Sequence, residues 1–272
     1  MIFNIACIQI STQNNMESNI LKISSLSKCD ICDDVDIITL PENAIFMGKC
    51  GEELLANSYY MEEHPAIDKL SELAKEINKW ILLGSVAVKI KNSHKIANRS
   101  ILIDNKGNIA KYYDKIHLYN ANVEGGESHN ESQRYIAGEK IAIADTPFGN
   151  IGMTICYDLR FPHLYRKIAK NHVHIITVPA AFTQYTGQAH WHILLRARAI
   201  ENSCFIVAPA QTGSHPSKRT TYGHSLIIDP WGNILADAGT SETVIKAQID
   251  TAKSCAIRKQ LPSLENDRNF DF

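Results

Sequence analysis

Cys156 lies where a predicted strand ends and a helix follows. In the stretch NIGMTICYDLRFP, residues 151–155 read as a strand, and a helix starts near Pro162. Such a turn presents the thiol at the carboxyl end of a sheet and aims backbone N–H groups at a bound ligand. The Tyr157 N–H would then suit an oxyanion hole, and the same amides would lower the thiol pKa. This is the chemistry of a cysteine nucleophile, although a cysteine at a strand end is often buried core.

A nucleophilic cysteine needs a base and a cation that stabilises developing negative charge. Glu42, in DIITLPENAIF, follows a strand that Pro41 ends, and a carboxylate at a buried strand end is costly unless it is paired or functional. Lys115, in YYDKIHLY, lies among aromatic and aliphatic residues, where a nearby carboxylate would keep it charged. The residues alone leave open whether this is a catalytic pair or a structural one.

None of the eleven histidines has a setting that predicts a base. His172 and His174 face one side of a strand without a third ligand. His190 and His192 flank a tryptophan in a helix, which indicates packing or an interface, and His224 is expected to make a structural hydrogen bond. We therefore expect no metal site and no cofactor.

The elements that must position these groups are short apolar runs alternating with longer amphipathic segments. Helices are expected at about 16–28, 62–79, 161–171 and 187–202. Strands are expected within 3–10, 36–40, 80–88, 98–105, 141–146, 150–156, 173–181, 204–211 and 223–229.

Two segments of the chain resemble each other, which supports a symmetric arrangement. SILIDNKGNIAK, from Ser100, resembles SLIIDPWGNILA, from Ser225, an offset of 225 − 100 = 125 positions. Each reads as two strands joined by an Asp-x-x-Gly-Asn turn. The pattern predicts an α/β protein in which two mixed sheets pack face to face with helices on the outer faces.

Composition limits the other function classes. The chain has 272 residues, 44% of them hydrophobic, and a formal net charge of −1. Scattered basic residues predict no nucleic-acid partner, and the lack of a long apolar run or signal peptide predicts no membrane association. Seven cysteines without an export signal indicate a reducing cytoplasm. We expect one domain, 1–272, because no linker interrupts the chain.

Together the motifs resemble the nitrilase, or carbon–nitrogen hydrolase, superfamily. LPEN at Glu42, YDKIHLY at Lys115 and ICYDLRFP at Cys156 match its Glu–Lys–Cys triad in order, and ESQRYIAGEK at Glu131 matches its second glutamate. Asp114 departs from the family pattern, which commonly has arginine before this lysine. The resemblance covers essentially the whole chain and implies a four-layer αββα sandwich. It also implies a homodimer formed through helices after the cysteine, or a higher homo-oligomer.

The resemblance also implies a mechanism. Glu42 would take the proton of Cys156, the thiolate would attack an amide carbonyl, and Lys115 and the Tyr157 N–H would stabilise the oxyanion. Water would then release the acid from a thioester. Glu131 would hold Lys115 or Glu42 in place.

The substrate expectation rests on the same resemblance. Arg160 resembles a position that binds a substrate carboxylate, unless it pairs with Asp158 or a neighbour, and Phe182 and Thr183 would line the pocket. Residues 179–202 and 221–239 are most similar to the branch that acts on deaminated glutathione or on ω-amides of keto acids, with a lean toward the first. An acyltransferase, a nitrile-hydrolysing enzyme and an inactive binding protein are the other readings.

Overall fold

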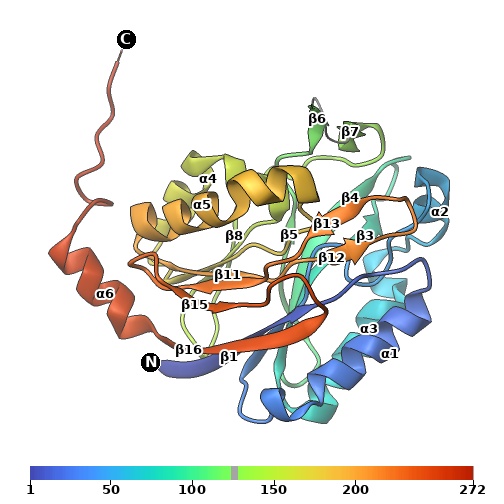
Figure 1. Ribbon diagram of the computed structural model, residues 1–272, viewed down its shortest axis with the longest axis horizontal. Helices are drawn as coiled ribbons and strands as arrows, with labels where there is room; N and C mark the ends of the chain where they lie inside the picture. The colour runs from blue at the N-terminus through green and yellow to red at the C-terminus, as the bar shows by residue number, and fades with distance from the viewer. Residues whose placement is uncertain (124–127, 272) are drawn as a thin grey trace.

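The computed structural model describes residues 1–123 and 128–271 and has four layers, α, β, β and α (Figure 1). Helices α1 and α3 cover the outer face of one sheet, and α4 and α5 cover the outer face of the other. This confirms the predicted sandwich. The helices are α1 (Met16–Ser27), α2 (Gly51–Ala56), α3 (Pro65–Ile77), α4 (Pro162–Ala169), α5 (Gln184–Asn202) and α6 (Thr251–Gln260).

Each large sheet is mixed, with three parallel strands at its centre. The first has the order β16-β1-β2-β3-β4-β5 and the second β15-β14-β11-β10-β9-β8. Strands β1–β3 and β9–β11 are parallel, and the flanking strands are antiparallel. The first sheet contains β1 (Ile2–Gln9), β2 (Ile37–Thr39), β3 (Trp80–Lys89), β4 (Ile96–Ile103), β5 (Ile109–Asp114) and β16 (Thr243–Asp250). The second contains β8 (Ala142–Ala144), β9 (Ile151–Met153), β10 (Ile175–Thr177), β11 (Phe205–Ala208), β14 (Leu226–Ile228) and β15 (Ile234–Asp237).

Two small two-stranded sheets lie outside the large sheets. They pair β6 (Asn120–Asn122) with β7 (Ser128–Asn130), and β12 (Thr212–Ser214) with β13 (Thr220–Tyr222). The predicted strands and helices are all present, with shifted ends; α3, for example, begins at Pro65, where the His64 ring accepts a hydrogen bond from the Ala66 N–H.

Both faces of the first sheet are buried along β1 to β4, which explains the apolar sequences of these strands. Along β1, Ile5 and Cys7 join the core between the sheets, while Ala6 and Ile8 join the core beneath α1 and α3. The helices and sheets therefore hold the ends of the central strands in fixed positions.

The two echoed hairpins are structurally equivalent. In each turn the aspartate Oδ1 accepts two backbone N–H groups, from Lys106 and Asn108 at Asp104 and from the matching residues at Asp229. The turns join β4 to β5 and β14 to β15, which occupy corresponding edges of the two sheets. The repeat thus reflects a pseudo-symmetric pair of sheets.

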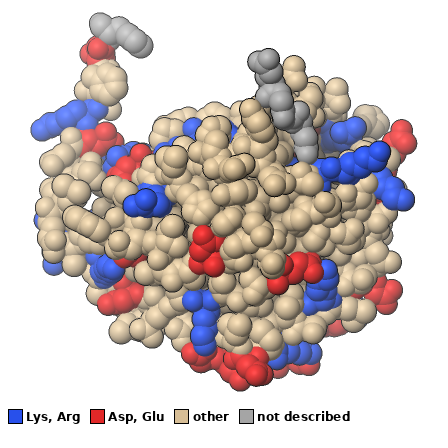
Figure 2. Space-filling view, in the orientation of Figure 1, with Lys and Arg blue, Asp and Glu red and all other residues tan. Residues whose placement is uncertain are grey.

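Charged side chains of both signs are interspersed on the face shown in Figure 2, as the near-neutral composition predicts. Among the described helices, none combines the length and the apolar character needed to cross a membrane.

Candidate active site

Segments that follow the central strands of the two sheets meet at one end of the sandwich. Glu42 follows β2 and Cys156 follows β9. The Ala181 N–H, from the segment after β10, donates to Glu42 Oε2 at 2.9 Å. Gln211, beyond β11, donates its side-chain N–H to the Glu42 carbonyl at 3.0 Å. The opposed sheets thus fix a glutamate and a cysteine at the same place.

Lys115 joins two carboxylates in this buried site. Its Nζ donates to Glu42 Oε1 at 2.9 Å and to Glu131 Oε1 and Oε2 at 3.0 and 2.9 Å. Glu131 Oε2 also accepts the Tyr119 N–H at 2.8 Å. The four residues predicted as catalytic are therefore brought together, and Glu131 contacts Lys115 rather than Glu42.

The ion pairs decide the charges of this cluster. Burial would lower the pKa of Lys115, but Glu131 and Glu42 raise it well above its usual value. Burial would raise the pKa of Glu42, but Lys115 and Arg219 attract its carboxylate and lower that pKa overall. At neutral pH the cluster therefore holds one ammonium between two carboxylates.

Cys156 is held in an uncommon backbone conformation beside Glu42. Its φ is +47°, and its backbone N–H donates to the Pro179 carbonyl at 2.9 Å. Burial, and then the negative charge of Glu42, raise the thiol pKa well above its usual value of 9.0. The sequence-based expectation of a lowered thiol pKa is wrong, because Cys156 is buried and its thiol hydrogen-bonds the Glu42 carboxylate. The resting cysteine is thus a thiol.

Asp158 supports the turn that carries the cysteine. Its fully buried carboxylate accepts hydrogen bonds from the Tyr113 hydroxyl at 2.7 Å and from the Ile155 N–H at 2.9 Å, and it contacts His117 Nδ1 at 2.7 Å. Asp158 thus pairs with these groups rather than with Arg160. Sequence reasoning missed the anchoring role of Asp158.

The predicted substrate residues share a narrow pocket with the thiol. Arg160, Phe182 and Thr183 line it together with Cys156 and the Tyr157 side chain. The Arg160 guanidinium lies 5.2 Å from the centre of the Phe182 ring and contacts His190 Nδ1 at 3.3 Å. The free volume is about 10 Å³, close to that of one water molecule. A substrate would therefore enter only as lining side chains move.

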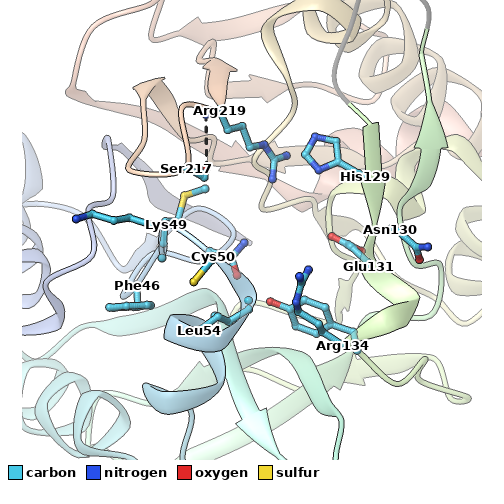
Figure 3. A pocket seen from close by; sticks show the side chains of 15 residues that line it. Phe46, Lys49, Cys50, Leu54, His129, Asn130, Glu131, Arg134, Ser217 and Arg219 are labelled. Carbon is cyan, nitrogen blue, oxygen red and sulfur yellow. Dashed lines mark hydrogen bonds between the residues drawn. The ribbon is translucent and has the colours of Figure 1, made fainter.

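A wider cleft of about 340 Å³ adjoins this pocket, and Arg219 lines both (Figure 3). Arg134 and Arg219 reach toward the cavity from opposite walls, whereas the Lys49 side chain points outward. Glu131 also lines the cleft, so the cavity reaches the group that holds Lys115. The cleft is suited to an anionic group larger than the narrow pocket admits.

Two further residues complete the polar site. Asn98, on β4, donates Nδ2–H to Glu42 Oε1 at 2.9 Å, and its carbonyl accepts the Lys115 N–H at 3.0 Å. A buried asparagine within an apolar strand was the available sequence signal. Arg219 donates to the Ala181 carbonyl, and nothing in its local sequence marks it. Asp114, the departure from the family pattern, forms a bidentate pair with Arg99 at 2.7 and 2.8 Å.

Two proteins with known names are similar to this chain in sequence. A protein from Yersinia enterocolitica named deaminated glutathione amidase is 37% identical over 97% of this chain and 93% of its own length. A protein with the same name from Dictyostelium discoideum is 40% identical over 84% of this chain and 81% of its own length.

Solved structures share the fold. The Caenorhabditis elegans NitFhit protein has a TM-score of 0.90 and 34% identity over 98% of this chain, which spans 65% of that protein. Saccharomyces cerevisiae Nit3, described as a member of branch 10 of the nitrilase superfamily, has a TM-score of 0.86 and 27% identity over 96% of this chain and 94% of its own. A family model described as carbon-nitrogen hydrolase matches residues 4–259. The chain therefore belongs to the carbon-nitrogen hydrolase family, within the nitrilase superfamily.

Proposed function

We propose that this hydrolase cleaves the amide bond of deaminated glutathione, giving 2-oxoglutarate and cysteinylglycine through a thioester on Cys156. The observation that carries the proposal is the buried bridge of Lys115 between Glu42 and Glu131, beside that thiol. The name of the Yersinia enterocolitica relative supports the choice of substrate.

In the acylation step, Glu42 takes the Cys156 proton as the sulfur attacks the amide carbonyl. The thiol pKa is raised and the Glu42 pKa is lowered, so proton transfer becomes favourable only as the S–C bond forms. Lys115 and the Tyr157 N–H stabilise the oxyanion, where loss of one donor typically costs about 3 kcal/mol. Glu42 then protonates the departing amine.

In the second step, Glu42 removes a proton from water, which attacks the thioester. The acid leaves, and the proton returns to the Cys156 sulfur. Glu131 keeps Lys115 in position through both of its oxygens. No metal or other cofactor takes part in this scheme.

Once the lining side chains of the narrow pocket move, the two cavities receive the two halves of the substrate. Arg160 binds the carboxylate of the keto acid, and Phe182 and Thr183 contact its carbon chain in the narrow pocket. The cysteinylglycine half lies in the wider cleft, where Arg134 pairs with its carboxylate.

A second candidate is an ω-amidase that acts on 2-oxoglutaramate or 2-oxosuccinamate, or an acyltransferase in which an amine replaces water. The acyl group of 2-oxoglutaramate is the same as that of deaminated glutathione, so the narrow pocket suits both, but ammonia as a leaving group would leave the 340 Å³ cleft unused. The cleft therefore supports the dipeptide amide.

The test compares turnover of deaminated glutathione and 2-oxoglutaramate, with Cys156→Ala as the blank. We expect Arg134→Ala to raise KM for the first substrate only, with Lys49→Ala as a matched control because that side chain points outward. Arg160→Ala should raise KM for both acids but not for a neutral amide. If neither acid is hydrolysed above the blank, the substrate proposal fails; full activity of Cys156→Ala would refute the mechanism.

We also propose that residues 1–272 act as one domain that forms a homodimer in the cytoplasm. The seven cysteines are free thiols, as suits a reducing compartment. Arg196 on α5 hydrogen-bonds the Gly232 carbonyl, so α5 and the β14–β15 hairpin lie side by side. They expose the large apolar residues Tyr185, Ile193, Ile200, Trp231, Ile234 and Leu235.

A further inference from the structure

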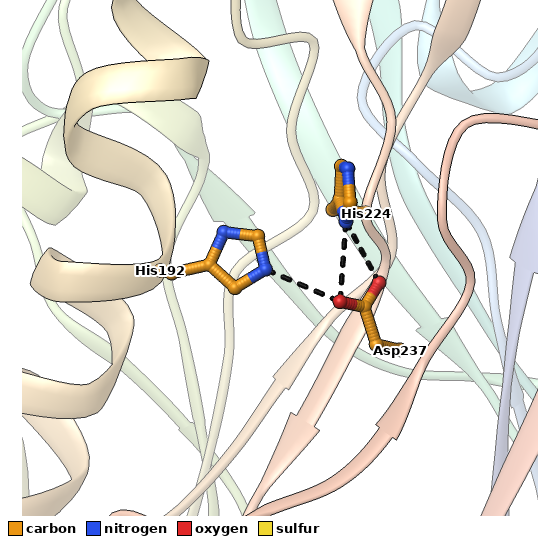
Figure 4. Close-up of side chains that lie close together, drawn as sticks. All are labelled: His192, His224 and Asp237. Carbon is orange, nitrogen blue, oxygen red and sulfur yellow. Dashed lines mark hydrogen bonds and ion pairs between the residues drawn. The ribbon is translucent and has the colours of Figure 1, made fainter.

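Three potential metal ligands converge outside the reaction pocket (Figure 4). His192 comes from α5, His224 from the segment between β13 and β14, and Asp237 from the end of β15. One ligand atom from each lies within 4.8 Å of the other two. None of the three lines the pocket of Cys156.

The distances are close to those of a metal coordination shell. Asp237 Oδ2 lies 3.2 Å from His192 Nε2 and 3.1 Å from His224 Nδ1. Adjacent ligand atoms of a tetrahedral Zn²⁺ site lie about 3.3–3.5 Å apart when the bonds are about 2.0–2.2 Å long. The side chains are 21–33% exposed, which leaves space for a water ligand.

The surrounding structure fixes the central histidine. His224 has a φ of +53°, its backbone N–H donates to the Gly239 carbonyl at 2.6 Å, and its carbonyl accepts the Trp191 indole N–H at 2.7 Å. The Tyr222 ring stacks on its imidazole with centroids 4.5 Å apart. Such support reduces the entropy lost when a ligand set closes on an ion.

The carboxylate is also held in position. Asp237 Oδ1 accepts the Gly239 N–H at 2.9 Å. Secondary contacts of this kind orient metal-binding carboxylates.

We propose that His192, His224 and Asp237 form a binding site for a divalent cation of the Zn²⁺ type, which fastens α5 to the β14–β15 hairpin. Two imidazoles and one carboxylate suit zinc, with water as the remaining ligand. The ion would bind the imidazole nitrogens that face Asp237, with each histidine carrying its proton on its other ring nitrogen. The competing explanation is a hydrogen-bonded clamp that binds no metal.

The test uses full-length Cys156→Ala protein, so that the nucleophile cannot bind metal, after treatment with a chelator. Calorimetric titration with Zn²⁺ should give one ion per chain, and Zn²⁺ should raise the melting temperature. Co²⁺ should give visible d–d bands without a thiolate charge-transfer band, which excludes the Cys29 and Cys32 thiols, whose sulfurs lie 4.0 Å apart.

Substitution separates the site from the clamp. His192→Gln and Asp237→Asn should each weaken Zn²⁺ binding at least tenfold, while His190→Gln, on the same helix, should not. Absent binding, or binding unchanged by both substitutions, would overturn the proposal. The proposal would also fail if Asp237→Asn lowered the melting temperature equally with and without Zn²⁺. That result would mean that the three side chains form a hydrogen-bonded clamp that binds no metal.

Discussion

Glu42→Gln tests the proposed general base with almost no change in shape. The carboxylate accepts Lys115 Nζ–H and Asn98 Nδ2–H on one oxygen and the Ala181 N–H on the other. A glutamine amide has only one acceptor atom, so one of these buried donors loses its partner. Cys156 also loses the group that takes its proton.

The two effects differ in size and are measured separately. Loss of general-base catalysis should lower kcat by about 10²–10⁴-fold. One unsatisfied buried donor should lower the free energy of unfolding by about 1–3 kcal/mol. Lys115 keeps both oxygens of Glu131, so its charge stays paired and the variant should fold.

The pH dependence of kcat/KM distinguishes a base from a structural residue. Because the folded pKa of Glu42 lies below its usual 4.5, wild-type activity should fall only as the pH drops through that lowered value. In Glu42→Gln this acid limb should disappear, and the residual rate should rise with pH as the Cys156 thiol, which stays buried but no longer faces a carboxylate, ionises. Urea denaturation checks folding, and Glu139→Gln, at an exposed position, is the matched control. A Glu42→Gln enzyme with wild-type kcat and an intact acid limb would refute the reasoning.

Three further outcomes follow from the contacts. Asn98→Ala removes a hydrogen bond to the Glu42 carboxylate, so kcat should fall about 10–100-fold in steady-state assays. An unchanged kcat would count against a positioning role of Asn98. Asp158→Asn replaces one acceptor oxygen by an NH2 group, so either the two donors on Oδ2, from Tyr113 and Ile155, or the two contacts from His117 on Oδ1 lose their acceptor. Urea denaturation should therefore report at least about 1–3 kcal/mol less stability, and an unchanged midpoint would contradict the anchoring role. Ile193→Asp places a charge on the exposed face of α5 and should yield folded monomers in sedimentation analysis; intact dimers would place the interface elsewhere.

The acidic and basic motifs were recognisable because each polar residue stands where apolar residues surround it. Pro41 ends the strand before Glu42, and aromatic and aliphatic residues flank Lys115. Both charged residues could therefore be identified from the sequence alone. The sandwich was predictable from the apolar runs and the repeated hairpin turn. Helix α6 and edge strand β16 were overlooked, since most of their residues remain partly or fully exposed and their apolar patterns are weak.

The parts that escaped prediction depend on contacts between distant segments. Arg219 reaches the site from a loop more than 170 residues after Glu42, and no local pattern marks it. The predicted direction of the pKa shift at Cys156 was wrong. The neighbouring residues indicate a helix start, but they do not reveal burial or the adjacent carboxylate. Burial and remote charge outweigh the local amides here.

The proposed mechanism gives a physical reason for the second glutamate of the site, Glu131. Before attack, the cluster holds the carboxylates of Glu42 and Glu131 and the ammonium of Lys115, while Cys156 is neutral. After attack, Glu42 is protonated and an oxyanion has formed, so two negative groups and one positive group are again present. Lys115 exchanges one anionic partner for another while Glu131 holds it through two oxygens. Because the buried charge moves only between neighbours of a fixed ammonium, the site needs little reorganisation to stabilise the transition state.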